Sequence, residues 1–117
     1  MWVKIFTQPE QAYAQLAEGK PRLVLLDKYR ITLVRKGDQF FAVDDFCTHN
    51  KESLSKGHTN YRNEIICPWH NYCFDLRTGR ESQQRSAELR TFVVKLNEEG
   101  LHIELPDEYA KLTIDNE

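Results

Sequence analysis

The sequence has few cysteines, no long apolar run and no excess of either charge, and each of these features excludes a class of protein. Three cysteines are an odd number, which argues against a disulfide framework and fits a reducing compartment. No stretch approaches the roughly 18 apolar residues that a membrane-spanning helix requires. Sixteen basic and eighteen acidic residues give a net charge of −2, which provides no electrostatic case for binding nucleic acid.

The length of the chain predicts one domain. A chain of 117 residues lies in the usual size range of a single domain, and it can bury roughly two-thirds of the surface that it exposes when unfolded. The first residues, Met1–Phe6, are too few and too mixed in polarity to be a signal peptide. We therefore expect a monomeric cytoplasmic protein with no membrane partner.

Two short stretches contain the residues with metal-binding chemistry. They are Cys47-Thr48-His49 and Cys67-Pro68-Trp69-His70, with seventeen residues between them, and each offers one thiolate and one imidazole. Two sulfur and two nitrogen ligands suit either a zinc ion or an iron–sulfur cluster. Structural zinc sites usually take two cysteines followed by two histidines, whereas both pairs here are mixed. In a mixed diiron centre two cysteines hold one iron and two histidines hold the other, which requires one Cys and one His from each of two facing loops.

At these residues the chain resembles the Rieske ferredoxin family. The resemblance rests on Cys47-x-His49-x17-Cys67-x-x-His70, is extended by Phe74-Asp75-x-x-Thr78-Gly79, and covers roughly Val3 to Leu105. It implies a [2Fe–2S] cluster at the tip of a small β domain, used to carry one electron at a time.

The resemblance also implies a role for each ligand. Cys47 and Cys67 would bind the inner iron as thiolates, and His49 and His70 would bind the outer iron through one ring nitrogen each. The outer iron would be the one reduced, and the histidine edges would face solvent. On this basis residues 1–105 are one Rieske domain with cluster-binding loops over 44–63 and 67–76. Residues 106–117 are an acidic tail, either solvated or a docking patch for a basic reductase or oxygenase surface.

The remaining pattern predicts an all-β protein, an antiparallel β sandwich or barrel with one short N-terminal helix and a small cluster-binding subdomain. Thr7 and Glu10 have the spacing of a capping box, which predicts a helix over about 9–18 that ends before Gly19 and Pro21. Strands are expected at Val3–Phe6, Leu23–Leu26, Ile31–Arg35, Gln39–Val43, Glu64–Ile66, Tyr72–Leu76, Thr91–Leu96 and Leu101–Leu105.

Some side chains in these elements have an expected orientation. Ala12, Leu16 and Tyr13 of the helix should face the core, and the continuous apolar run Leu23–Leu26 should be a buried strand. Alternation in the last strand should place Leu101, Ile103 and Leu105 on one face, with His102 and Glu104 on the other, solvated face.

Departures from the high-potential members of the family predict a low reduction potential. The second cysteines that form a disulfide between the two loops in those members are replaced by Glu52 and Trp69. The Ser and Tyr hydroxyls near the cluster sulfurs are replaced by Tyr72, which is too long to substitute for Ser, and by Phe74. Without those hydrogen bonds the potential should lie at the low end of a range of about −150 to +300 mV.

Other residues near the ligands have weaker expected roles. Asn71 stands where the family usually has Gly after the second histidine, and Asn tolerates positive φ well. Cys73 is off the ligand spacing and is interpreted as a small apolar filler, with a reactive thiol as the alternative. Trp69 and Leu54 are expected to shield the cluster, and the alternative for Trp69 is core packing. Further from the motif, Asp75 should hold the turn toward Thr78 and Gly79, while His58 should be solvated.

Three functions remain open. The first is a free ferredoxin that carries electrons from a flavin reductase to a non-haem iron oxygenase. The second is the small subunit of an assimilatory nitrite reductase, disfavoured because some such subunits lack the cluster ligands. The third is a zinc-stabilised interaction module. In the first two the chain carries electrons and is not itself an enzyme, because it is too short to include a second domain for mononuclear iron.

Overall fold

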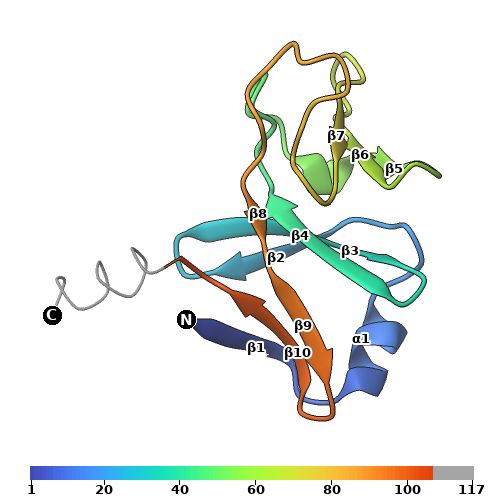
Figure 1. Cartoon of the computed structure of the whole chain (residues 1–117), viewed down its shortest axis with the longest axis vertical. Coiled ribbons are helices and arrows are strands. Elements are labelled where there is room, and N and C mark those ends of the chain that lie inside the picture. Colours follow the sequence, from blue (N-terminus) through green and yellow to red (C-terminus); the bar gives the residue numbers. More distant parts are fainter. Residues whose placement is uncertain (107–117) are drawn as a thin grey trace, which may run out of the picture.

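The computed structural model describes residues 1–106 and confirms the predicted all-β class (Figure 1). The predicted acidic tail falls on residues 107–117 apart from Pro106, and so lies outside the described residues. Three antiparallel sheets have the strand orders β1-β10-β9, β2-β3-β4-β8 and β5-β6-β7. The strands are β1 (Trp2–Phe6), β2 (Arg22–Leu26), β3 (Tyr29–Lys36), β4 (Gln39–Asp44), β5 (His58–Thr59), β6 (Glu64–Ile66), β7 (Cys73–Asp75), β8 (Thr91–Phe92), β9 (Val94–Asn97) and β10 (Gly100–Glu104).

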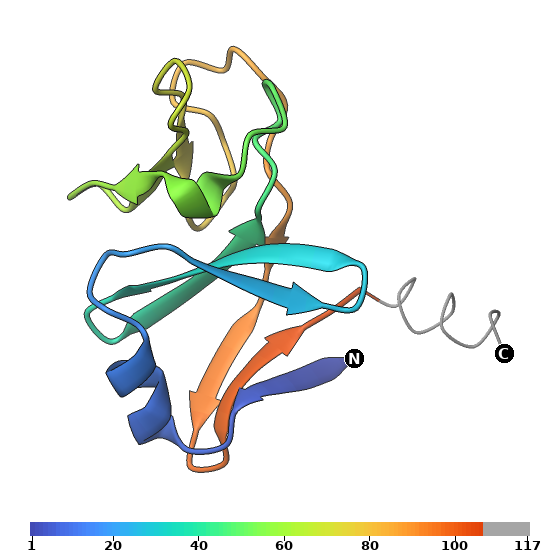
Figure 2. The same cartoon turned by 180° about the vertical axis from the view of Figure 1, so that it is seen from behind.

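The four-stranded sheet lies in the middle of the molecule and is covered on both faces. Figure 2 shows the β1-β10-β9 sheet on one side of it and the β5-β6-β7 sheet on the other. Ile31 and Leu33 of β3 point into a core shared with β10, whereas Val34 and Val43 belong to a second core below the small sheet. Side chains alternate along a strand, so the central sheet can build both cores at once.

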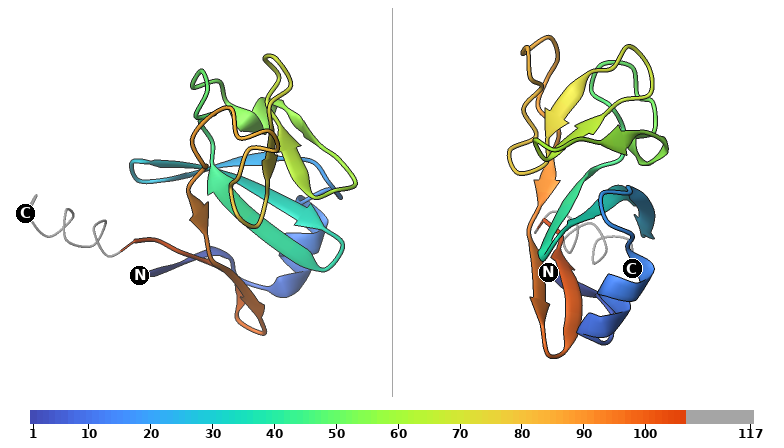
Figure 3. Two further views of the ribbon diagram at one scale, coloured as in Figure 1. Left: turned by 45° about the horizontal axis from the view of Figure 1, so that its top comes forward. Right: turned by 90° about the vertical axis from the view of Figure 1, so that its right-hand side faces the viewer.

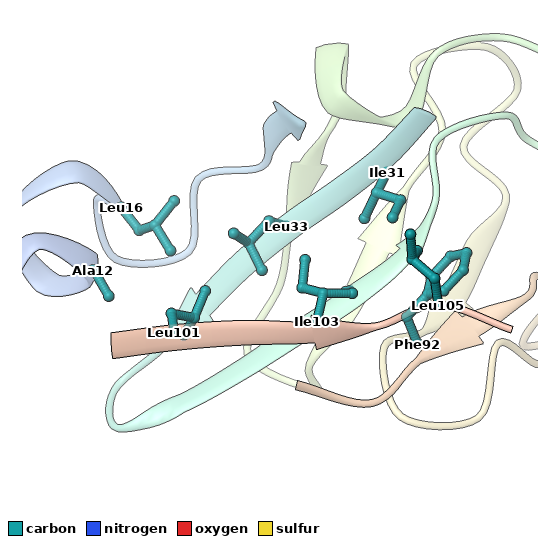
Figure 4. Packing of buried hydrophobic residues seen from close by; sticks show 9 residues of the cluster. Ala12, Leu16, Ile31, Leu33, Phe92, Leu101, Ile103 and Leu105 are labelled. Carbon is teal, nitrogen blue, oxygen red and sulfur yellow. The ribbon is translucent and has the colours of Figure 1, made fainter. Parts of the chain in front are cut away.

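The larger core joins the central sheet, the β1-β10-β9 sheet and the helix (Figure 4). Leu101, Ile103 and Leu105 are buried, as the alternation in the last strand predicts. The prediction that His102 is solvated was wrong, because its side chain is half-buried. Its Nδ1 atom is buried and has no hydrogen-bond partner among residues 1–106.

The helix α1 (Pro9–Gln15) is shorter than predicted and is capped differently. Gln8, not Thr7, is the N-cap, and the side-chain oxygen of Gln11 accepts hydrogen bonds from the backbone N–H groups of both Thr7 and Gln8, at 2.9 and 3.1 Å. Leu16 leaves the helix with extended backbone angles, and its carbonyl accepts a hydrogen bond from Nε of Arg35 at 2.8 Å. This tertiary contact replaces a further helical turn.

Ala12 and Leu16 are buried as predicted, but Tyr13 is not. The Tyr13 side chain is 38% exposed, its ring meets Phe40 edge-on at 5.4 Å, and its hydroxyl donates to Asp38 at 3.3 Å. Tyr13 therefore covers the edge of the β3–β4 hairpin from outside the core.

Two strand predictions also need correction. β2 is an edge strand that pairs only with β3 among the described strands, and Leu25 is 60% exposed, so the apolar run is not a fully buried strand. The predicted strand over 91–96 is broken at Val93, which is 59% exposed. There the chain passes from the central sheet into the β1-β10-β9 sheet.

The polar segment 44–63, predicted as a loop, contains two short elements. The 3-10 helix η1 (Leu54–Lys56) and β5 both lie in it, and β5 pairs with β6. The predicted turn after β7 is confirmed: Oδ1 of Asp75 accepts the backbone N–H groups of Arg77 and Thr78, and Gly79 has a φ of +80°. A side chain at Gly79 would also overlap the carbonyl oxygen of Leu89.

No helix among the described residues is long and apolar enough to cross a membrane.

Candidate metal centre

Both predicted ligand stretches lie at one end of the molecule, beyond the edge of the central sheet (Figure 3). Cys47 follows β4, and Cys67 directly follows β6. The backbone N–H of Cys47 donates to the carbonyl of Glu52 at 2.9 Å, and that of Cys67 donates to the carbonyl of Tyr72 at 2.8 Å. Each cysteine therefore closes a small loop by a hydrogen bond to the residue five positions later.

Left-handed backbone shapes the two loops. Asn71 has a φ of +55°, the left-handed backbone that was expected at this position. The preceding ligand His70 is also left-handed, with a φ of +63°, and Lys51 in the first loop has a φ of +61°. Such angles cost a non-glycine residue roughly 1–2 kcal/mol each, so the surrounding contacts must support them.

The donors form an inner sulfur pair and an outer imidazole pair. Cys47 and Cys67 are fully buried. His49 and His70 are exposed, and their ring centroids are 5.4 Å apart at an interplanar angle of 74°. The structure thus brings the two cysteines together and the two histidine rings together, with one cysteine and one histidine of each pair from each loop.

The chemistry of this donor set fits a diiron cluster. Burial, together with the neighbouring Cys47 thiol, raises the pKa of the Cys67 thiol to about 11. The buried Cys67 thiol therefore does not ionise readily without a compensating positive charge, which bound metal would supply. In residues 1–106, no group of three or more His, Cys, Asp or Glu side chains is placed to hold a single metal ion. A mixed diiron cluster takes its donors as one pair of thiolates and one pair of imidazoles, and side-chain pairs of both kinds are present here.

The sequence matches the family model of the Rieske [2Fe-2S] domain over residues 6–93. The chain belongs to the Rieske [2Fe-2S] domain family. The cofactor of this domain is a [2Fe–2S] cluster, and the cluster supplies a one-electron couple when it is bound.

Relatives of this Rieske domain include ferredoxin components. The 3-phenylpropionate/cinnamic acid dioxygenase ferredoxin subunit of Photorhabdus laumondii is 33% identical over 79 residues, which are 67% of this chain and 75% of that protein. The ferredoxin of carbazole 1,9a-dioxygenase from Nocardioides aromaticivorans superposes with a TM-score of 0.79 at 26% identity, covering 91% of this chain and 99% of that one.

A third similarity concerns the fold alone. The putative NADH-dependent nitrite reductase small subunit of Mycobacterium tuberculosis superposes with a TM-score of 0.76 at 19% identity, covering 91% of this chain and 96% of that one. The fold is therefore shared with a dioxygenase ferredoxin and with a putative nitrite reductase small subunit.

Apolar side chains enclose the sulfur end of the Rieske site. Leu54 and Phe74 are fully buried in the same cluster of side chains as Cys47 and Cys67. Trp69 is 57% exposed and its ring lies edge-on to His70 at 5.9 Å, so it is not a core residue. The sulfur end is dry, while the imidazole end meets solvent.

Cys73 and His58 can be compared with their predicted roles. Cys73 is half-buried, its thiol lies 3.5 Å from the carbonyl of Asn71, and burial raises its pKa. A raised pKa opposes reactivity and favours the interpretation of Cys73 as a packing residue. His58 is exposed, as expected.

Asp45 supports the first loop and was not singled out from the sequence. Its fully buried carboxylate accepts hydrogen bonds from the Thr32 hydroxyl at 2.7 Å, the Ser53 hydroxyl at 2.6 Å and the Ser55 backbone N–H at 2.9 Å, and it pairs with Arg30 at 3.3 Å. Burial alone would raise the pKa of Asp45, but the hydrogen bonds outweigh it and lower the pKa overall. Asp45 is therefore an ionised, buried carboxylate that anchors the loop two residues before Cys47.

We expect the substitution Phe74→Tyr to raise the reduction potential of the Rieske centre. Phe74 packs with both cysteines, so a hydroxyl added there can hydrogen-bond to sulfur and stabilise the more negative reduced state. Protein-film voltammetry measures the shift, and Phe40→Tyr, in the other core, is the control. An unchanged potential in a Phe74→Tyr protein with an intact cluster would show that sulfur hydrogen bonding does not set the potential.

Proposed function

We propose that Cys47, His49, Cys67 and His70 hold the [2Fe–2S] cluster in this chain. The support is the pairing of two buried thiols with two exposed imidazoles at the tip of the fold. Thiolates balance iron charge in the dry interior, and imidazoles are neutral ligands that tolerate contact with water. Residues 1–105 are proposed to be one Rieske domain, with cluster-binding segments 44–63 and 67–76.

The proposed activity is transfer of single electrons between two protein partners. The chain accepts one electron from a flavin reductase and passes it to a non-haem iron oxygenase, so that one partner is oxidised and the other is reduced by the same electron. The observation that carries this proposal is the exposure of both histidine rings, because a partner can approach the imidazole end closely. The names of the ferredoxin relatives give the class of oxidant.

The protein is proposed to act as a monomeric, cytoplasmic carrier and not as a catalyst. None of its three cysteines forms a disulfide, which fits a reducing compartment. The second candidate is the small subunit of a nitrite reductase, favoured only by the shared fold.

Purification of the protein from its native cells would distinguish these functions. A free carrier should elute from a size-exclusion column as a monomer and should show the electron paramagnetic resonance signal of a reduced Rieske centre. It should then be oxidised, with one electron per chain, by a purified ring-hydroxylating oxygenase. Stable co-elution with a much larger subunit would favour the nitrite reductase, and a colourless protein containing zinc would refute electron transfer.

A further inference from the structure

Besides Asp45, a second fully buried carboxylate near the site is that of Glu81. Glu81 is fully buried and accepts two hydrogen bonds from the Arg85 guanidinium, Nε to Oε1 at 3.1 Å and Nη2 to Oε2 at 2.8 Å. The backbone N–H of Arg85 also donates to Oε1 at 2.8 Å. These bonds lower the pKa of Glu81 to about 2, so the carboxylate is ionised at neutral pH.

The anchored guanidinium leads to one of the histidines through a stack of planar groups. Cζ of Arg85 lies 3.8 Å from the centroid of the Tyr72 ring, which is the distance of a close cation–π contact. The Tyr72 ring is stacked on the imidazole of His49, with centroids 4.0 Å apart and planes 12° from parallel. Among residues 1–106, His70 has no such stack and meets Trp69 and His49 edge-on.

A second contact ties the same segment to the first loop. The Thr48 hydroxyl, between Cys47 and His49, donates to the carbonyl of Ala87 at 2.6 Å and lies 2.9 Å from the Ser86 hydroxyl. Residues 81–87 thus touch the second loop through Tyr72 and the first loop through Thr48. This segment, which contains none of the proposed ligands, therefore lies against both ligand loops.

We propose that Tyr72, Arg85 and Glu81 are positioning residues that hold the His49 imidazole in one orientation and place a fixed ion pair beside the outer end of the cluster. This inference rests on the proposed function, because it takes His49 as a ligand. The family resemblance matches Tyr72 to the serine of high-potential members, and in this chain the Tyr72 ring is stacked on an imidazole.

The two members of the ion pair affect the potential with opposite signs. Reduction adds one negative charge to the site, so the Arg85 cation stabilises the reduced state and the Glu81 anion destabilises it. Because Glu81 is shielded from water, its charge is weakly screened. Neutralising Arg85 should therefore lower the reduction potential, and neutralising Glu81 should raise it.

Voltammetry on the cluster-loaded full-length protein tests this inference. Arg85→Gln is expected to shift the potential downward and Glu81→Gln to shift it upward. Arg85→Lys, which keeps the charge, should stay near the wild-type value. Arg80→Gln is the matched control, since it removes an exposed arginine from the neighbouring turn and should shift the potential little. Shifts of the same sign in Arg85→Gln and Glu81→Gln, or no shift in either, would overturn the proposal.

Electron paramagnetic resonance of the reduced variants tests the orientation of His49 separately. Tyr72→Phe keeps the ring and should retain the wild-type g values, whereas Tyr72→Leu removes the stack and should shift them. If Glu81→Gln fails to fold with its cluster, the Tyr72 pair and Arg85→Lys still decide the outcome. Identical spectra for Tyr72→Phe and Tyr72→Leu would refute the positioning role. Absence of a Rieske signal from the wild-type protein would instead refute the proposed function.

Discussion

Replacing Cys67 with alanine is expected to abolish cluster binding, with loss of both irons and of the visible absorption of the protein. In the proposed ligand set Cys67 is one of two sulfur donors, and both cysteines are fully buried, where water has little access as a substitute ligand. Without that thiolate one iron would keep a single protein ligand, and the two imidazoles would not be expected to retain the cluster alone. Iron analysis and absorption spectra after anaerobic purification measure the loss.

The matched control is Cys73→Ala. Cys73 is the third cysteine, lies six residues from Cys67 and is half-buried beside the same loop, but its thiol lies near the Asn71 carbonyl. The Cys73→Ala protein should keep two irons per chain and the wild-type spectrum. Full iron content in Cys67→Ala, or loss of iron in Cys73→Ala, would contradict the proposed ligand set.

The second large effect is expected from Asp45→Ala. Truncation removes the acceptor for the Thr32 and Ser53 hydroxyls and for the Ser55 N–H, and it leaves Arg30 without its ion-pair partner. Removing one partner of a buried charged network typically costs about 3 to 5 kcal/mol of unfolding free energy. Urea unfolding at pH 7 measures the change. Because the first ligand loop starts at Asp45, the variant should also release its cluster faster.

The destabilisation by Asp45→Ala should depend on pH, whereas a simple loss of packing should not. The folded state lowers the pKa of Asp45, so its stabilisation is present above the ordinary carboxyl pKa near 4 and is lost as the pH falls through the lower folded value. The stability gap between wild type and Asp45→Ala should narrow below about pH 4. Asp38→Ala, which removes an exposed carboxylate, should change stability by less than about 0.5 kcal/mol. Equal destabilisation by both substitutions would rule out a special role for Asp45.

The candidate metal site could be predicted from the sequence because its residues lie close together along the chain. A cysteine and a histidine at fixed offsets, repeated after seventeen residues, can be recognised because the loops that carry them are short and self-contained. Each loop is closed by one hydrogen bond from its own cysteine, so no distant residue is needed to define it. The positive φ at Asn71 was predictable for the same reason.

The residues that support the site could not be predicted from the sequence. Asp45 meets Thr32 from another strand, and nothing in the sequence around Asp45 marks it as buried. Glu81 and Arg85 have the i,i+4 spacing of an ion pair, but that spacing usually means a surface pair on a helix, and here the segment is irregular. From the sequence, Tyr72 was interpreted only as a side chain too long to replace a serine. Its stacking on His49 could not be predicted, because that contact depends on a ring from the other loop.

The β class and the buried residues of the last strand could be predicted from the sequence, because both depend on spacing along a short piece of chain. The same kind of spacing predicts the four metal donors. Only the tertiary structure decided where α1 ends, where the strand breaks at Val93 and which side chains surround the donors. Arg35 ends the helix by binding Leu16, and Arg85 reaches His49 through Tyr72. Such contacts join residues that are far apart in the chain, and their free energy exists only once the sheets have packed.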